Sequence, residues 1–117
     1  PETASVSDDR LKADIWIMAH VRQCSSLGVS AMVVRHGDDR GGSLMLKINR
    51  LENGCRVLSQ AVDEDGNRAW LAAFKGATVP EAEADAYIAR AVGRDSDLWV
   101  VEIEHKDGWH PFGGKEI

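Results

Sequence analysis

The chain has 117 residues, of which 44% are hydrophobic and 28% are charged, as in an ordinary single globular domain. Its 14 Lys and Arg residues against 19 Asp and Glu give a formal net charge of −5. This balance argues against non-specific binding to nucleic acid, which depends on clustered basic residues. The longest apolar run, from Ile15 to Ala19, is far shorter than the roughly 20 residues of a membrane-spanning helix.

The first nine residues are polar, and we expect them to form a flexible tail. Residues 1–10 contain no apolar segment of the kind found in signal peptides, although an earlier segment could have been removed. The two cysteines, Cys24 and Cys55, lack the spacing of metal ligands, and without an export signal we expect both to be reduced. The chain is therefore expected to be cytoplasmic.

Residues 11–27 carry apolar side chains at helical spacing and predict a helix followed by Gly28, although alternation in the first few residues also allows an extended start. Residues 29–36, 43–51, 55–62 and 68–74 each predict a short strand. Two connectors, Asn53-Gly54 and Asp65-Gly66, are typical of two-residue hairpin turns. The pattern predicts a four-stranded antiparallel meander.

A capping box at Thr78-Val79-Pro80-Glu81 predicts a second helix that extends to about Val92. Residues 98–105 predict a fifth strand whose first half is buried on both faces. We expect an α+β fold, in the order helix, meander, helix, fifth strand, with both helices on the sheet face that carries Trp70 and Phe74. Residues 10–107 would form one domain between tails at 1–9 and 108–117.

Tight turns centred on the two glycine-containing pairs would fix which residues share a face of the sheet. The first face is apolar and is expected to form the core, with Ala31, Val33, Leu44, Leu46, Ile48, Val57, Ala61, Trp70 and Phe74. The second face is apolar with a polar centre, and carries Met32, Val34, Met45, Leu58, Val62 and Leu71 around Lys47, Asn49 and Gln60. In this register Lys47 lies opposite Gln60.

Four segments resemble a small bacterial family known as domain of unknown function 1491. The segments are residues 10–16 (RLKADIW), 46–51 (LKINRL), 80–90 (PEAEADAYIAR) and 97–104 (DLWVVEIE), and the resemblance extends over about residues 10–107. It implies a cytoplasmic bacterial protein. It supplies no activity, so no functional residues are carried over from the family.

The polar centre formed by Lys47, Asn49 and Gln60 is the strongest candidate site. Its apolar rim of Met32, Met45, Leu58 and Leu71 fits a small-molecule site, a dimer interface, or a half-exposed sheet face with no function. Trp109 lies beside Pro111 and Phe112 in the C-terminal tail and is the tryptophan that we expect to be exposed, covering an edge or contacting a partner.

Other patterns favour structural interpretations. The four histidines, His20, His36, His105 and His110, do not form a metal motif, and we expect neither a metal nor a cofactor. Residues 63–67 are interpreted as a hairpin turn and not a calcium loop, and residues 37–42 as a flexible connector and not a phosphate loop. Cys24, one helical turn after His20, is interpreted as a buried helix residue and not a nucleophile.

Our leading hypothesis is a non-enzymatic binding or assembly module that forms a cytoplasmic homodimer through the second sheet face. The alternative is a small enzyme or small-ligand-binding protein with a pocket around Lys47. Nucleic-acid binding would require five arginines to converge on one patch, namely Arg10, Arg22, Arg35, Arg50 and Arg56.

Overall fold

The computed structural model describes residues 11–117, so the tail predicted at residues 1–9 lies outside the described part. The elements, in order, are α1 (Ala13–Ser26), β1 (Ser30–Arg35), β2 (Leu44–Asn49), β3 (Cys55–Val62), β4 (Arg68–Ala72), α2 (Glu81–Arg94), β5 (Trp99–Glu104) and β6 (Lys115–Glu116). Both predicted helices and all five predicted strands are therefore present. The α+β class is confirmed.

The sheet is mixed and its strand order is β1-β5-β2-β3-β4-β6, so the predicted four-stranded meander is wrong. β5 lies between β1 and β2, antiparallel to the first and parallel to the second. The physical reason is the apolar run at the start of β5. Trp99, Val100 and Val101 are each at most 1% exposed, and only a central strand can bury side chains on both faces.

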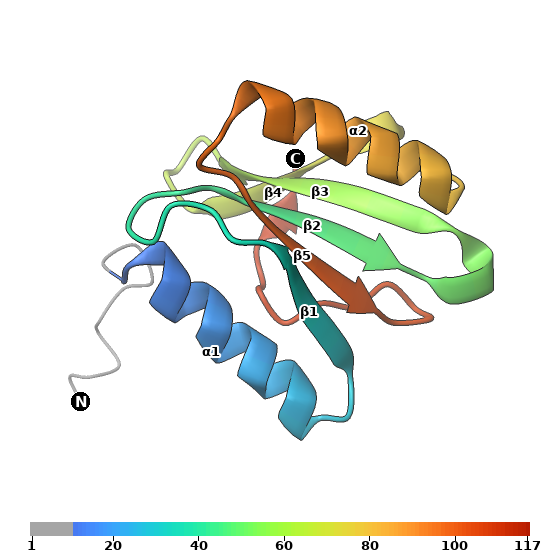
Figure 1. Cartoon of the computed structure of the whole chain (residues 1–117), viewed down its shortest axis with the longest axis horizontal. Coiled ribbons are helices and arrows are strands. Elements are labelled where there is room, and N and C mark those ends of the chain that lie inside the picture. The colour runs from blue at the N-terminus through green and yellow to red at the C-terminus, as the bar shows by residue number, and fades with distance from the viewer. Residues whose placement is uncertain (1–10) are drawn as a thin grey trace.

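The two helices cover opposite faces of the sheet (Figure 1). The face under α1 buries Trp16 and Ile17 of the helix against Leu46, Trp70, Trp99 and other sheet residues. The face under α2 buries Ala84 and Ile88 against Met45, Val57 and Val100. The prediction of both helices on one face is wrong because both sheet faces are apolar and each needs a cover.

The first hairpin turn is longer than predicted. The Arg50 N–H donates to the Gly54 carbonyl oxygen at 2.8 Å, and the residues between them form a short 3₁₀ turn. Ile48 therefore pairs with Arg56, three residues from its predicted partner Ser59. A shift by an odd number inverts a strand, so Val57 lies on the α2 side and Leu58 on the α1 side.

The second hairpin turn also holds three residues, between the Asp63 N–H and the Asn67 carbonyl, which are 2.9 Å apart. Gln60 consequently pairs with Trp70, a shift by one residue from the prediction. This second odd shift cancels the first, so Trp70 lies on the same face as Leu46, as predicted. The interpretation of residues 63–67 as a turn is confirmed: the Asp63 carboxylate accepts the Asn67 N–H at 2.9 Å, which lowers the pKa of Asp63.

The helix ends show why local signals succeed or fail. Gly28 follows α1 with φ +75°, and the Val29 N–H donates to the Cys24 carbonyl at 2.9 Å, as in a Schellman motif. At α2 the capping box does not form, because the helix begins at Glu81 after Pro80 and has no side-chain cap. The Glu81 carboxylate instead binds Lys47.

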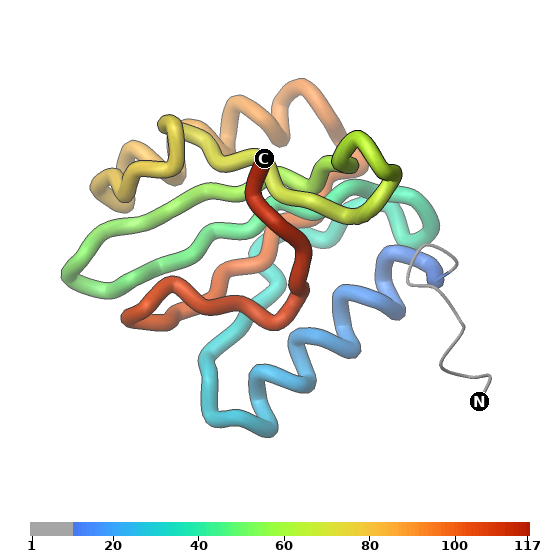
Figure 2. Tube along the Cα trace, turned by 180° about the vertical axis from the view of Figure 1, so that it is seen from behind, coloured from blue at the N-terminus to red at the C-terminus, as the bar shows by residue number. Residues whose placement is uncertain are grey.

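Residues 108–117, predicted to be an irregular tail, pack on the α1 side of the sheet (Figure 2). Phe112 is 5% exposed in the core, and Trp70 Nε1 donates to the Gly113 carbonyl. β6 then pairs in parallel with β4, where Glu116 accepts two hydrogen bonds from the Arg56 guanidinium, which lowers the pKa of Glu116.

Candidate functional site

Lys47 is the one buried charged residue among residues 11–117, with 5% of its surface exposed under α2. Its Nζ lies 2.7 Å from Glu81 Oε2 and 2.7 Å from Asp85 Oδ1, two carboxylates one turn apart on α2. The Glu102 carboxylate of the neighbouring β5 lies 3.6 Å away. Lys47 therefore ties α2 to the centre of the sheet.

The surroundings of Lys47 favour its charged form. Burial alone would lower the pKa of the ammonium, but hydrogen bonds to Asp85 and Glu81 and the charge of Glu102 outweigh burial and raise it. A lysine acts as a base or nucleophile only after it loses its proton. The geometry at Lys47 thus supports an ion-pair role and not chemistry.

Asn49 lies on the same face and joins the Lys47 cluster through Glu102. Its Nδ2 donates to Glu102 Oε2 at 3.1 Å, and its Oδ1 accepts the Leu51 N–H at 2.9 Å. Both polar groups of Asn49 are therefore engaged within the fold.

The other residues predicted to surround Lys47 on the second sheet face do not lie together. Gln60 and Leu58 lie on the α1 side, because of the register shift in β3, and Gln60 Oε1 accepts the Leu44 N–H at 2.8 Å. Met45 is buried beneath α2. Met32 and Leu71 share the Lys47 face but lie on β1 and β4, outside the area covered by α2, and are 56% and 54% exposed. Lys47 and Asn49 are the predicted polar residues that the fold does bring together.

Sequence reasoning missed the three carboxylates that bind or approach Lys47. Glu81 and Asp85 are four residues apart on the predicted second helix, a spacing that places them on one helix face. The sequence did not identify Lys47 as the partner of these two carboxylates, because in the expected sheet no helix covered Lys47. The contact of Glu102 with Lys47 was not predicted, because it exists only when β5 lies beside β2 in the sheet.

Trp109 is 38% exposed, in agreement with the expectation that it is the exposed tryptophan. Its ring lies 5.7 Å from that of His105, whose Nδ1 accepts the Asp107 N–H at 3.1 Å. Together with Leu27 and Val29 these residues line a shallow groove of about 460 Å³ where α1 ends and β1 begins.

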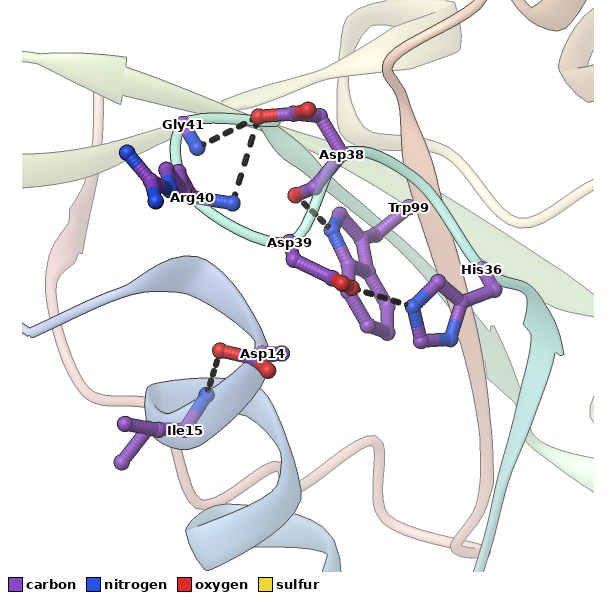
Figure 3. Close-up of polar contacts among 8 residues, drawn as sticks. All are labelled: Asp14, Ile15, His36, Asp38, Asp39, Arg40, Gly41 and Trp99. Carbon is purple, nitrogen blue, oxygen red and sulfur yellow. Dashed lines mark hydrogen bonds and ion pairs between the residues drawn. The ribbon is translucent and has the colours of Figure 1, made fainter.

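The loop at residues 37–42, which we interpreted as a connector, is held to its neighbours by hydrogen bonds (Figure 3). The Asp38 carbonyl accepts the Trp99 indole N–H at 2.8 Å, and the Asp38 carboxylate accepts the Gly41 N–H at 2.8 Å. His36 binds Asp39 at 2.6 Å and contacts the Trp99 ring. The loop carbonyls of Asp39 and Arg40 accept the first backbone N–H groups of α1, so this loop fixes where the helix begins.

The remaining candidates are engaged in the fold. Within residues 11–117, no group of three or more His, Cys, Asp or Glu residues is arranged to hold a metal ion. His20 Nδ1 bonds to the Trp16 carbonyl oxygen at 2.8 Å, and its ring stacks on Phe112. Cys24 and Cys55 are buried free thiols, and burial raises the pKa of each.

Three of the arginines considered for nucleic-acid binding have separate partners inside the fold, and Arg22 is exposed on α1. Arg35 donates to the Leu98 carbonyl, Arg50 to the Lys106 carbonyl and Arg56 to the Gly76 carbonyl. Arg10 lies outside the described residues. No helix in residues 11–117 is long and apolar enough to cross a membrane.

Three solved structures resemble this chain. A crystal structure of a DUF1491 family protein from Caulobacter crescentus is 36% identical, with a TM-score of 0.77, and the match covers 92% of this chain and 97% of that one. An NMR structure of a DUF1491 family protein from the same organism is 39% identical, with a TM-score of 0.77 and coverage of 92% and 96%. The solution structure of protein Atu0922 from A. tumefaciens is 26% identical, with a TM-score of 0.67 and coverage of 81% and 86%.

No curated protein matches the chain. Residues 11–113 match the family described as a protein of unknown function, DUF1491. The expected resemblance is thus confirmed over nearly all of the described residues, and the chain belongs to the DUF1491 family.

Proposed function

We propose that this chain is a non-enzymatic binding and assembly module that forms a homodimer through the free edge of β1. The observation that carries the proposal is the exposure of Met32 and Val34, which are 56% and 53% exposed on an edge strand. The interface differs from the one expected from the sequence, because α2 covers the centre of the second sheet face. The parts of that face on β1 and β4 remain exposed, and the part on β1 lies at a free sheet edge.

β1 pairs with β5 along one side, and no other strand of the described residues pairs with its outer side. An edge strand presents unpaired backbone N–H and C=O groups, and natural proteins often protect such edges with Lys or Pro. β1 contains neither residue. It does have a bulge between Val33 and Arg35, which leaves Ser30 to Val33 in regular register for pairing.

A second copy of the chain suits this edge because two antiparallel edge strands can pair about a two-fold axis. With the axis at Met32, this residue would face the Met32 of the second copy, and Ala31 would face Val33, all within the regular segment. The pairing would place the two Met32 side chains against each other and join the two sheets into one.

The groove beside Trp109 extends the same surface. Ser30 pairs with Glu104, and His105 follows directly, so the groove lies at the start of β1. Leu27, which is 58% exposed, lies at its rim. A standard dimer buries about 800 Å² on each partner. One strand is too small for that area, and we therefore include the groove in the proposed interface.

We further propose that the protein is bacterial and cytoplasmic. The similar structures come from Caulobacter crescentus and A. tumefaciens, which supports a bacterial origin. The two cysteines are buried free thiols, Cys24 within α1 and Cys55 under α2, and are suited to a reducing compartment.

The alternative, an enzyme or ligand-binding protein centred on Lys47, has no supporting observation. Lys47 is 5% exposed and has its carboxylate partners within the fold, so a substrate would have to displace α2 to reach it.

Size-exclusion chromatography with light scattering tests the dimer. We expect the full chain at micromolar concentration to have twice its monomer mass of 12.8 kDa. The variant Met32→Lys should be monomeric, because a second copy would bring two ammonium groups together at the axis.

Leu71→Lys is the matched control, since Leu71 is equally exposed and lies on the same sheet face, but on β4. This variant should remain dimeric. A wild-type mass of 12.8 kDa, or an equal loss of mass in both variants, would refute pairing through β1.

A further inference from the structure

The C-terminal segment covers the edge of the sheet opposite β1. Residues 108–117, which we name the C-terminal strap, cross the α1 side of the sheet (Figure 2). They end in β6, which is the strand that pairs with the outer side of β4 within residues 11–117. We propose that the C-terminal strap is a pH-sensitive cover, closed on β4 at neutral pH and open in mild acid.

The contacts of the C-terminal strap lie at one edge of the molecule. Phe112 is 5% exposed, and its ring centroid lies 5.1 Å from that of Trp16. The Trp70 indole N–H donates to the Gly113 carbonyl, and the Ile117 N–H donates to the Trp70 carbonyl at 2.9 Å. Breaking these contacts leaves the pairing of the four central strands intact, so the C-terminal strap can open without global unfolding. Opening would free the outer edge of β4.

His110 supports the closed position only while its Nδ1 carries no proton. Nδ1 accepts the Phe112 N–H at 3.1 Å, which a neutral imidazole can do through its unprotonated nitrogen. The ring also packs edge-on against Trp70, with the centroids 5.5 Å apart. In the protonated form both ring nitrogens are donors, so Nδ1 would direct a proton at the Phe112 N–H. Protonation therefore removes a bond that orients Phe112 in the closed C-terminal strap.

The groups around His110 come from four elements. Glu116 lies on β6, Arg56 on β3 and His20 on α1, and Arg68 is the charged residue of β4 on this face of the sheet. Burial is the main cause that lowers the pKa of His110 below its ordinary value of 6.5. The Glu116 carboxylate opposes this effect, whereas the charges of Arg56 and His20 reinforce it. The closed C-terminal strap thus favours the neutral form of His110.

This preference couples the position of the C-terminal strap to pH. When the C-terminal strap is open, His110 meets water and regains its ordinary pKa, so the open form binds protons more readily than the closed form. The closed form keeps its full advantage above about pH 6.5 and loses it as the pH falls, by at most about tenfold for each pH unit. Glu116 acts in a separate range, because its hydrogen bonds with Arg56 lower the pKa of Glu116 below 4.5.

Hydrogen exchange of the full chain, followed by mass spectrometry, tests the proposal. Protection factors correct for the dependence of the intrinsic exchange rate on pH, and residues 112–117 are compared with the paired strands of residues 44–62. We expect protection of residues 112–117 to fall by about threefold or more between about pH 7.5 and about pH 5.5. Protection of residues 44–62 should stay constant, because the central strands remain paired.

Two asparagine variants assign the effect to one imidazole. His110→Asn places an amide oxygen near the position of Nδ1, where it can accept the Phe112 N–H without titrating, and should abolish the fall. His105→Asn is the matched control, since His105 Nδ1 accepts the Asp107 N–H at 3.1 Å in the turn before the C-terminal strap. This variant should keep the wild-type pH dependence.

Four results would overturn the proposal. They are constant protection of residues 112–117 in the wild type, an equal fall in residues 44–62, an unchanged fall in His110→Asn, and loss of the fall in His105→Asn. The wild-type comparison and the His105→Asn variant decide the question even if His110→Asn does not fold.

Discussion

The charge of Lys47 is engaged entirely inside the fold. Two carboxylates of α2 lie 2.7 Å from its Nζ, and the carboxylate of Glu102 lies 3.6 Å away. Removing one partner from a buried ion pair is costly because the remaining charges lose their compensation. In this cluster Glu81 and Asp85 are 56% exposed and can regain water, whereas Glu102 is 15% exposed and cannot do so fully.

The variant Lys47→Met should therefore lower the free energy of unfolding by about 2 kcal/mol, less than the roughly 3–5 kcal/mol for a fully buried pair, because two of the three carboxylates can regain water. Urea denaturation followed by circular dichroism measures this change. Lys106→Met, which removes an exposed lysine, serves as the control. A loss for Lys47→Met within about 0.5 kcal/mol of the control would show that the ion pairs do not hold α2 in place.

At the scale of elements, local patterns predicted the helices and strands to within a few residues. Helical spacing together with Gly28 was sufficient for α1, and the apolar run of β5 predicted its burial on both faces. The helix ends were less accurate where a tertiary contact competed with a local one. Glu81 binds Lys47 and does not cap α2, so the helix begins three residues after Thr78.

Local sequence patterns could not predict the register of the paired strands or the position of β5 in the sheet, for two physical reasons. Each hairpin turn holds three residues, and an odd error in register moves a strand's side chains to the opposite face. The candidate site depended on that register, so Gln60 was placed beside Lys47 and lies instead on the other side of the sheet. The insertion of β5 beside β2 pairs residues that are 55 positions apart in the chain, and no turn signal reports such a pairing.

The packing of the 37–42 loop can be tested with its adjacent glycines, Gly41 and Gly42, because one has open space around it and the other does not. A Cβ on Gly42 would lie 2.2 Å from the Asp97 carbonyl oxygen, whereas the nearest atom to a Cβ on Gly41 is 3.9 Å away. Gly42→Ala should destabilise the protein by about 1–3 kcal/mol through overpacking, and Gly41→Ala should be close to neutral. Thermal unfolding of both variants measures the difference. Equal melting temperatures would mean that the loop does not pack against Asp97.

At the scale of the whole molecule, one sheet separates two cores that share their central strands. β5 contributes Trp99, Val101 and Ile103 to the core under α1 and Val100 to the core under α2. β2 does the same with Leu46 and Met45. Loss of either core would expose one face of both strands to water, so we expect the two layers to unfold together.

The two cysteines report on the two layers separately. Cys24 lies on α1 and is 0% exposed, and Cys55 lies under α2 and is 1% exposed. Burial raises the pKa of both thiols, so neither should react while the fold is closed.

The variants Cys24→Ala and Cys55→Ala each leave one thiol. Labelling of that thiol by a disulfide reagent in low urea measures the free energy of opening around it. After correction for the stability of each variant, we expect both thiols to give the free energy of global unfolding. Labelling of Cys24 more than about tenfold faster than that of Cys55 would instead mean that α1 opens independently while the sheet and α2 stay folded.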